Sequence, residues 1–208
     1  MPAPVRRVEG KVAPLDADDV DTDQIIPAQF LKLVERRGLG KYLFYRWRYT
    51  DDGRPIPGFV LDSQEFKDAS ILAAGRNFGI GSSRENAVWA LQDFGIKAVL
   101  ASSFGDIFYV NCSKNGLLCV KLPDEVLKSI RDSAKSGKLT MTIDLEEQTI
   151  KYDDKILRFE IEPNIKERLL KGLDDIGLTL SQYGHLIEEH ERRAPKFLYP
   201  RPRNLITE

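Results

Sequence analysis

Residues 75–86, GRNFGIGSSREN, place three glycines within seven residues, followed by two serines, an arginine and a glutamate. An apolar stretch precedes this segment and a helical pattern follows it, so the segment joins a buried strand to a helix N-terminus. Such a point presents unpaired backbone N–H groups and roughly +0.5 of an elementary charge. Glycines let an anion approach these groups closely. The segment is therefore a candidate anion-binding site on physical grounds.

A second interpretation of the same residues is purely structural. Ser82 and Glu85 match the capping-box pattern S-x-x-E ahead of an apolar helix face. A capping serine needs no other function. Glycine loops between a strand and a helix are nevertheless the usual ligand site of open α/β sheets, so the residues alone leave both interpretations open.

The segment does not fit the common nucleotide-binding motifs. Its glycine spacing is G-x-x-x-G-x-G, whereas dinucleotide-binding proteins have G-x-G-x-x-G. The next apolar strand ends in Ala101-Ser102-Ser103, which offers no acidic residue to a ribose. No lysine follows the glycines, as a P-loop would require.

A calcium site is a further candidate, in DVDTDQIIP. Asp19, Asp21 and Asp23 match D-x-D-x-D, but the sixth position is Gln24 and the twelfth is Phe30. An EF-hand needs glycine and glutamate there, so that interpretation fails. The structural alternative is a turn rich in aspartate before the next element.

Histidines and cysteines indicate no metal site in this chain. His185 and His190 exceed the H-x-x-E-H zinc spacing by one residue, and helix positions five apart do not share a face. Cys112 and Cys119 are seven apart, which fits no zinc or redox motif. An iron–sulfur cluster usually takes four thiolates. If this protein works with such a cluster, most of the ligands must come from another chain.

The elements around the glycine segment predict a parallel sheet. Residues 70–75, 96–101 and 116–122 are short and continuously apolar, as strands buried on both faces should be. Between the first two, Ala87, Ala90, Leu91 and Phe94 form one helix face, and a shorter helical pattern separates the last two. This β-α-β-α-β pattern predicts an α/β fold with right-handed crossovers.

The rest of the chain adds strands and helices to this core. The patterns predict an irregular strand over 5–15, a short helix and long loop over 40–58, antiparallel strands over 138–162, and helices over 28–37, 123–137, 163–172 and 179–194. The 208 residues suffice for one domain spanning 1–208, with a loose tail from about residue 195.

Composition limits the classes of partner. The 31 basic and 32 acidic residues give a net charge of −1, so bulk electrostatics favour neither nucleic acid nor an anionic membrane as partner. No stretch approaches the roughly 18 apolar residues of a spanning helix. The start, MPAPVRRVEGK, lacks the apolar core of a secretory signal. We therefore expect a cytoplasmic protein.

Taken together and in order, four segments carry a specific resemblance. They are DVDTDQIIPAQFL (19–31), GRNFGIGSSRENAVWAL (75–91), SFGDIFYVNCSKNGLL (103–118) and GLDDIGLTL (172–180). The chain resembles the small subunits of 3-isopropylmalate dehydratase, the isopropylmalate isomerase of leucine biosynthesis. These subunits are similar to the mobile C-terminal domain of aconitase. The resemblance covers nearly the whole chain.

The resemblance implies a fold, a partner and a reaction. The fold would be the swivelling β/β/α domain, and the enzyme a heterodimer or a larger assembly of heterodimers. The large subunit would carry a [4Fe–4S] cluster on three cysteines, with one iron open to the hydroxyl and carboxylate of the substrate. This hydro-lyase would remove water from 2-isopropylmalate to give isopropylmaleate, and return it at the neighbouring carbon to give 3-isopropylmalate.

The resemblance also implies the functional residues. Ser82 would be the base that takes the proton from carbon, and the helix N-terminus and Arg84 would stabilise its alkoxide. Ser83 and Arg84 would hold a substrate carboxylate, which a guanidinium can bind bidentately. Gly81 would let the dicarboxylate approach the helix. Thr22 and Asp23 match the T-D pair of the family, in which Asp23 would orient a neighbouring group.

Several positions bear on substrate choice. Arg36 falls where related subunits carry a basic residue in a substrate-discriminating segment, but Arg37 replaces the expected threonine. The family usually has histidine at the position of Asn86, and often cysteine at that of Ile80. These departures leave open a related hydro-lyase acting on homoaconitate or a methyl-substituted malate. A stand-alone anion-binding module is the alternative from a different class.

Overall fold

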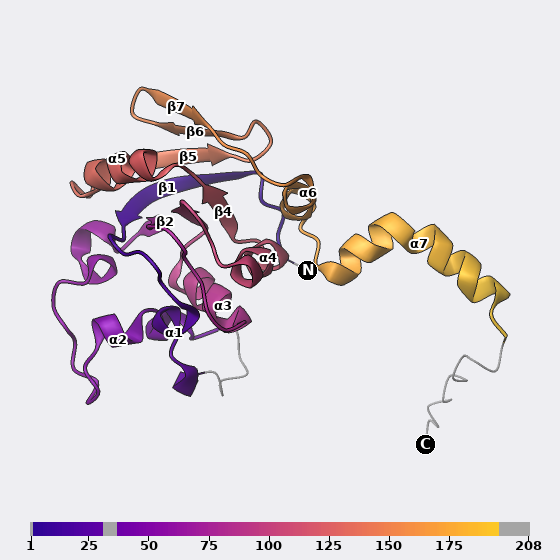
Figure 1. Cartoon of the computed structure of the whole chain (residues 1–208), viewed down its shortest axis with the longest axis horizontal. Helices are drawn as coiled ribbons and strands as arrows, with labels where there is room; N and C mark the ends of the chain where they lie inside the picture. The colour runs from indigo at the N-terminus through magenta and orange to yellow at the C-terminus, as the bar shows by residue number, and fades with distance from the viewer. Residues whose placement is uncertain (1, 31–36, 196–208) are drawn as a thin grey trace, which may run out of the picture. The chain divides into compact units, whose positions relative to one another are not determined.

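A mixed sheet forms the centre of the protein (Figure 1). The computed structural model describes residues 2–30 and 37–195. Its parallel part consists of β1 (Arg7–Pro14), β2 (Ala69–Ala73), β3 (Ala98–Ala101) and β4 (Leu118–Lys121). α3 (Glu85–Phe94) connects β2 to β3, and α4 (Asp106–Asn115) connects β3 to β4. The predicted β-α-β-α-β core is confirmed.

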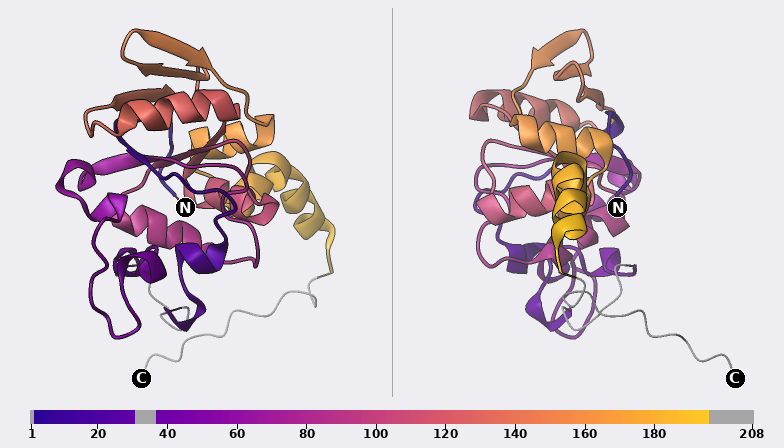
Figure 2. Two further views of the ribbon diagram at one scale, coloured as in Figure 1. Left: turned by 60° about the vertical axis from the view of Figure 1, so that its left-hand side comes forward. Right: turned by 90° about the vertical axis from the view of Figure 1, so that its right-hand side faces the viewer.

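The remaining strands extend the same sheet in the antiparallel sense. β5 (Thr140–Asp144) pairs with β1, and β6 (Thr149–Tyr152) and β7 (Lys155–Arg158) follow. The order of the seven-stranded sheet is β4-β3-β2-β1-β5-β6-β7. The β6–β7 hairpin lies at its edge (Figure 2). The predicted strands over 138–162 are thus antiparallel, as expected.

β2 and β3 are buried along their whole length because both faces of the sheet are covered there. Leu72 and Val99 belong to one core, whereas their neighbours Ile71 and Leu100 belong to the other. α3 covers the first face, and α5 (Asp124–Ala134) covers the second (Figure 1). Alternate residues of each strand therefore enter different cores.

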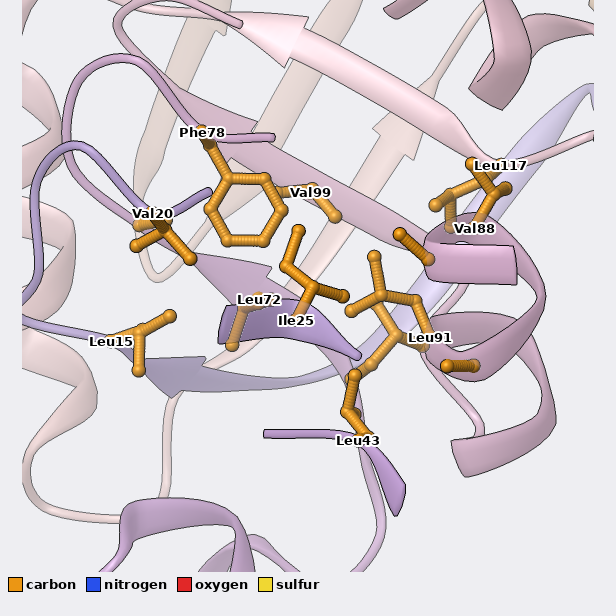
Figure 3. Close-up of a cluster of buried hydrophobic side chains, with 14 of the residues drawn as sticks. Leu15, Val20, Ile25, Leu43, Leu72, Phe78, Val88, Leu91, Val99 and Leu117 are labelled. Carbon is orange, nitrogen blue, oxygen red and sulfur yellow. The ribbon is translucent and has the colours of Figure 1, made fainter. Parts of the chain in front are cut away.

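The first core also fixes the segments that resemble the dehydratase small subunits. Figure 3 shows Ile25, Phe78 and Leu91 in one buried cluster with Leu72 of the sheet. Ile25 comes from α1 (Thr22–Ile25), and Phe78 comes from the glycine segment. Ile25, Phe78 and Leu91 are fully buried. Burial of these side chains anchors the polar residues beside them.

A series of short helical turns covers this side of the protein. They are the 3₁₀ turns Ala28–Phe30, Gly40–Tyr42, Val60–Asp62 and Gln64–Phe66, with α2 (Tyr45–Arg48) among them. The predicted α-helix over 28–37 is wrong at Ala28–Phe30, which form a 3₁₀ turn, and residues 31–36 lie outside the described part. Phe30 stacks on Tyr42 with ring centroids 4.0 Å apart. This aromatic contact takes the place of an amphipathic helix face.

Two helices follow the sheet, α6 (Pro163–Lys171) and α7 (Asp175–Arg193). The chain divides into two compact units, residues 1–174 and 175–208. The single domain over 1–208 stays a prediction. His185 and His190 lie exposed on α7, the helix expected over 179–194. Among the described residues, no helix combines the length and apolar character needed to span a bilayer.

Candidate functional site

Backbone hydrogen bonds join three segments that are far apart in sequence. The N–H of Thr22 donates to the carbonyl oxygen of Ile80 at 2.9 Å, and that of Gly79 donates to Val20 at 2.7 Å. On the other side, the N–H of Phe78 donates to Ser103 at 3.0 Å. The glycine segment therefore lies between residues 19–22 and 103–105. The segments that carry the resemblance form one local structure.

Asn77 fastens the same junction through its side chain. Its Nδ2 donates to Oδ1 of Asp19 at 2.6 Å, and its Oδ1 accepts from Oγ of Ser103 at 2.9 Å. Asn77 and Asp19 both have left-handed backbone, with φ of 53°. Asparagine and aspartate tolerate that conformation better than most residues. The amide thus connects both neighbouring segments to the loop.

Two glycines of the loop are required by the backbone. Gly79 has φ of +76°, and a Cβ there would lie 2.3 Å from Cγ of Phe108. Gly81 has φ of +93° and lies beside Asp21 and Thr22. Side chains rarely adopt such φ values, and at Gly79 there is no room for one. The glycines let the loop turn tightly in front of α3.

The predicted capping box at Ser82 is wrong. α3 begins at Glu85, its N-cap is Arg84 with φ of −133°, and no side chain caps it. Glu85 instead accepts a hydrogen bond from Nδ2 of Asn115 at 2.8 Å. Ser82 and Ser83 are exposed, and neither hydroxyl makes a hydrogen bond within the described residues. Both hydroxyls are available to a ligand.

A capping box does form at α1, where the sequence analysis proposed only a turn. Asp21 accepts from the N–H of Gln24 at 2.7 Å, and Oε1 of Gln24 accepts from the N–H of Asp21 at 2.8 Å. The sequence D-T-D-Q is a variant of the capping pattern and could have indicated it. This box fixes the start of α1, and with it Thr22 and Asp23.

Thr22 connects α1 directly to the serine segment. Its side chain is buried, and its Oγ1 donates to the carbonyl oxygen of Ser82 at 2.9 Å. The hydrogen bond spans 60 positions of sequence. Thr22 thus fixes the backbone at the residue expected to act as the base.

Asp23 holds Arg84 by an ion pair. Nη1 of Arg84 donates to Oδ1 of Asp23 at 2.5 Å and to the carbonyl oxygen of Ile26 at 3.2 Å. The Arg84 side chain is 16% exposed. The hydrogen bond from Arg84 is the main cause that lowers the pKa of Asp23; the Ala28 N–H and the charge of Arg46 act in the same direction against burial. Both bonds that Arg84 makes to described residues come from Nη1, which leaves Nε and Nη2 for a ligand.

Arg46 of α2 joins the same carboxylate, and no site was predicted there. Its Nη1 donates to Oδ2 of Asp23 at 2.5 Å. The sequence analysis noted the long aromatic and basic segment 40–58, a length at which loops are often functional. Nothing in its spacing indicates which basic residue reaches Asp23, because that contact depends on how α2 packs against α1.

A small surface pocket of about 220 Å³ opens at this junction. It is lined by Thr22, Arg84 and residues 79–82 and 105–108. Thr22, Gly81, Ser82 and Arg84 are thus brought together, whereas Asp23 lies behind Arg84 and Ser83 lies outside the lining. The α4 residues of this wall, among them the exposed Asp106 and Ile107, were not expected.

The positions that bear on substrate choice do not all lie at this pocket. Arg36 lies outside the described residues. Arg37 is exposed. Asn86 is half-buried in the first turn of α3, and Ile80 is half-buried in the pocket wall. Of these departures from the family pattern, Ile80 alone lines the described pocket.

Neither cysteine lines this pocket. Cys112 and Cys119 are buried and unpaired by any disulfide, and burial raises the pKa of the Cys112 thiol well above its usual value. Such thiols are poor metal ligands, because coordination requires the thiolate. Within the described residues, no three His, Cys, Asp or Glu side chains are placed to hold a metal ion.

A larger groove of about 970 Å³ contains none of the predicted residues. Its lining includes Lys121, Arg158 and Glu162. Glu162 already accepts hydrogen bonds from Tyr109 at 2.7 Å and Lys121 at 3.2 Å. Size alone therefore does not identify the functional site, and the smaller pocket beside Ser82 and Arg84 is the better candidate.

Comparisons with known proteins agree with this geometry. The family model of the aconitase C-terminal domain matches residues 3–125. A 3-isopropylmalate dehydratase small subunit from Bacillus licheniformis is 49% identical over 196 residues, covering 94% of this chain and 98% of the relative. One from Phenylobacterium zucineum is 53% identical over 189 residues, covering 90% and 93%. The chain belongs to the family of 3-isopropylmalate dehydratase small subunits.

A solved structure supports the fold of this dehydratase family. The crystal structure of 3-isopropylmalate dehydratase (leuD) from Methanocaldococcus jannaschii matches with a TM-score of 0.64 and 27% identity, covering 89% of this chain and 99% of that one. The expected resemblance and the aconitase C-terminal-like α/β fold are confirmed. The family is one of hydro-lyases, and its name describes the small component of a two-subunit enzyme.

Proposed function

We propose that this chain is the small subunit of 3-isopropylmalate dehydratase and acts in the isomerisation of 2-isopropylmalate and 3-isopropylmalate through isopropylmaleate. One observation carries the proposal: an exposed serine and a guanidinium held by a carboxylate line the same pocket. A base and a cation at one site suit proton removal from a carbon next to a carboxylate. The names of the relatives specify the substrate.

Ser82 is the residue we assign to proton transfer. Its exposed hydroxyl lines the pocket just before α3. In dehydration, the Oγ of ionised Ser82 would take the proton from the carbon beside the one that loses its hydroxyl, and the double bond forms between these carbons. In rehydration, Ser82 returns the proton to the other carbon. The α3 N-terminus and Arg84 would stabilise the alkoxide.

Arg84 and Ser83 are assigned to a substrate carboxylate. Nε and Nη2 of Arg84 form an edge that can bind two carboxylate oxygens. Nη1 is anchored by Asp23 and Ile26, so the guanidinium is already oriented before substrate arrives. A group that is oriented in advance binds with less loss of side-chain entropy. Asp23 therefore acts through Arg84, and Gly81 and Thr22 shape the wall around Ser82.

The remaining chemistry would come from a large subunit. A [4Fe–4S] cluster held there would bind the substrate hydroxyl and carboxylate and act as a Lewis acid. To that division this chain would contribute the base Ser82 and the carboxylate-binding cation Arg84, which line one pocket. Activity only in the complex, a cytoplasmic location and the absence of nucleic-acid partners remain parts of the proposal.

Reconstitution tests this function. The chain is combined under anaerobic conditions with the cluster-bearing large subunit of the same source, and 2-isopropylmalate, homoaconitate and methyl-substituted malates are compared. We expect the complex alone, and neither subunit by itself, to turn over 2-isopropylmalate with the highest kcat/KM. Preference for homoaconitate or a methylmalate would replace the substrate assignment. Failure to associate with any such subunit would favour an anion-binding module instead.

A further inference from the structure

Asp23 is shared between two guanidinium groups that approach different oxygens. Arg84 donates to Oδ1 at 2.5 Å, and Arg46 donates to Oδ2 at 2.5 Å. The Ala28 N–H adds a bond to Oδ1 at 3.0 Å. Because the two arginines use opposite oxygens, both bonds form at once. The carboxylate is therefore held on both sides while it holds Arg84.

Arg46 reaches Asp23 from an element that buried contacts hold in place. Phe44, which precedes α2, is fully buried with φ of 51°, a strained conformation for an aromatic residue. Its N–H donates to Ile25 at 2.8 Å, and its ring stacks on Trp47 at 5.1 Å. Such strain persists only where the surroundings determine the backbone. The direct bond to Ile25 fixes α2 against α1, which carries Asp23.

A second arginine of α2 strengthens this arrangement. Arg48 is 7% exposed and forms hydrogen bonds from Nε and Nη2 to the carboxylate of Asp62. Its Nη1 also donates to the carbonyl oxygen of Leu43 at 3.1 Å. α2 therefore has one arginine that anchors it to the protein and another, Arg46, that points to Asp23. The position of Arg46 follows from packing and not from a free loop.

Charge explains what the second arginine adds. Arg84 and Asp23 alone form a neutral pair, in which the carboxylate competes with an anionic substrate for the guanidinium. With Arg46 the three groups carry a net charge of +1, and the negative charge of Asp23 is divided between two cations. Arg84 then keeps its orientation, and it attracts a substrate carboxylate more strongly than it would if Asp23 were paired with Arg84 alone.

We infer that Arg46 is a positioning residue for dicarboxylate binding, which acts by holding Oδ2 of Asp23 and thereby keeps Arg84 directed to the pocket. This inference rests on the proposed function. Arg46 is 60% exposed, but its partner Asp23 is 29% exposed and is bonded to a pocket residue. The pair of Arg46 and Asp23 thus differs from a pair in which both partners are exposed, such as Arg54 and Asp52, whose side chains are 79% and 57% exposed. An isolated exposed pair contributes little.

Kinetics of the reconstituted two-subunit enzyme test the inference. Arg46→Gln should raise KM for 2-isopropylmalate about fivefold to tenfold, with kcat within about twofold, because the lost interaction orients a binding group. Arg46→Lys should recover most of the affinity, since a single donor atom makes the bond to Asp23. Arg54→Gln, in the loop that follows α2, is the matched control and should leave both constants unchanged.

A double-mutant cycle separates action through Asp23 from direct contact with substrate. If Arg46 acts through Asp23, adding Arg46→Gln to Asp23→Asn should raise KM no further. Multiplying effects would overturn the inference, as would an unchanged KM in Arg46→Gln or no recovery with lysine. Thermal unfolding and co-elution with the large subunit check that each variant is folded and assembled.

The two proposals fail in different ways. If the wild-type complex turns over none of the dicarboxylates, the proposed function fails and the inference with it. If the wild type is active and Arg46→Gln has wild-type KM, the inference alone fails. If another dicarboxylate proves to be the substrate, the same variants are measured with that compound and the same outcomes decide.

Discussion

The hydroxyl group of Thr22 donates a hydrogen bond to the carbonyl oxygen of Ser82 at 2.9 Å, while the N–H of Thr22 donates to the carbonyl oxygen of Ile80 at 2.9 Å. One buried residue thus binds the backbone on both sides of Gly81. Thr22 lies in α1, whose start is fixed by the Asp21 capping box. The position of the proposed base therefore depends on an element 60 residues away in sequence.

Thr22→Val should lower kcat markedly while it lowers the free energy of unfolding only modestly. The substitution keeps the shape of the side chain but removes the donor to Ser82, so we expect a loss of about 1 kcal/mol in the free energy of unfolding. Misplacement of a catalytic group lowers turnover, and kcat should fall by about tenfold. Urea unfolding and steady-state kinetics of the reconstituted complex measure both. Thr50→Val, which removes a hydroxyl bonded to Arg54 at 3.2 Å, is the control; an equal effect of both variants on kcat would contradict the prediction.

Ser82→Ala should lower turnover by orders of magnitude without destabilising the protein. Ser82 does not cap α3 and is exposed, so the free energy of unfolding should change by less than about 0.5 kcal/mol. Removal of a general base typically costs about 10²–10⁴ in rate. The readouts are kcat of the complex and urea unfolding of the chain. Ser83→Ala, assigned to binding, should mainly raise KM. A near-normal kcat in Ser82→Ala would refute the assignment of the base.

Arg84→Lys should impair both substrate binding and turnover. Lysine keeps the charge, but it cannot bond Asp23 and Ile26 while also presenting the Nε–Nη2 edge to a carboxylate. We expect KM to rise by about tenfold or more and kcat to fall, measured with 2-isopropylmalate. A wild-type KM would count against a carboxylate-binding role for Arg84. Co-elution with the large subunit controls for loss of assembly.

Asp23 should make stability depend on pH in a defined direction. Its folded-state pKa is lowered, mainly by the hydrogen bond from Arg84. A lowered pKa means that its contribution is fully present above the unfolded value of about 3.9 and is lost as pH falls through the folded value. Asp23→Asn should thus be less stable than wild type at pH 7, with a difference that shrinks below about pH 4. Urea unfolding from pH 3 to 7 measures this. The exposed Asp51→Asn is the control, and a difference at pH 3 as large as that at pH 7 would disprove the linkage.

The sequence by itself determined the parallel core and its helices. The continuous apolar runs around Leu72, Val99 and Val120 indicated strands covered on both faces, and glycines, Gly95 and Gly116, end α3 and α4. These features follow from local periodicity and from residues that terminate helices. The motif residues also indicated Ser82, Arg84, Thr22 and Asp23 through their resemblance to the dehydratase small subunits.

The tertiary structure decided how these residues act on one another. Arg84 and Asp23 are 61 positions apart, so no local pattern shows that they pair. Local pattern also suggested that Ser82 caps α3, whereas the bonds of its loop to residues 19–22 and 103–105 start the helix at Glu85. Arg46 reaches Asp23 because Phe44, with its left-handed backbone, bonds to Ile25 and so holds α2 against α1. Periodicity reports burial along one element, but the partners of a charged side chain depend on how separate elements pack.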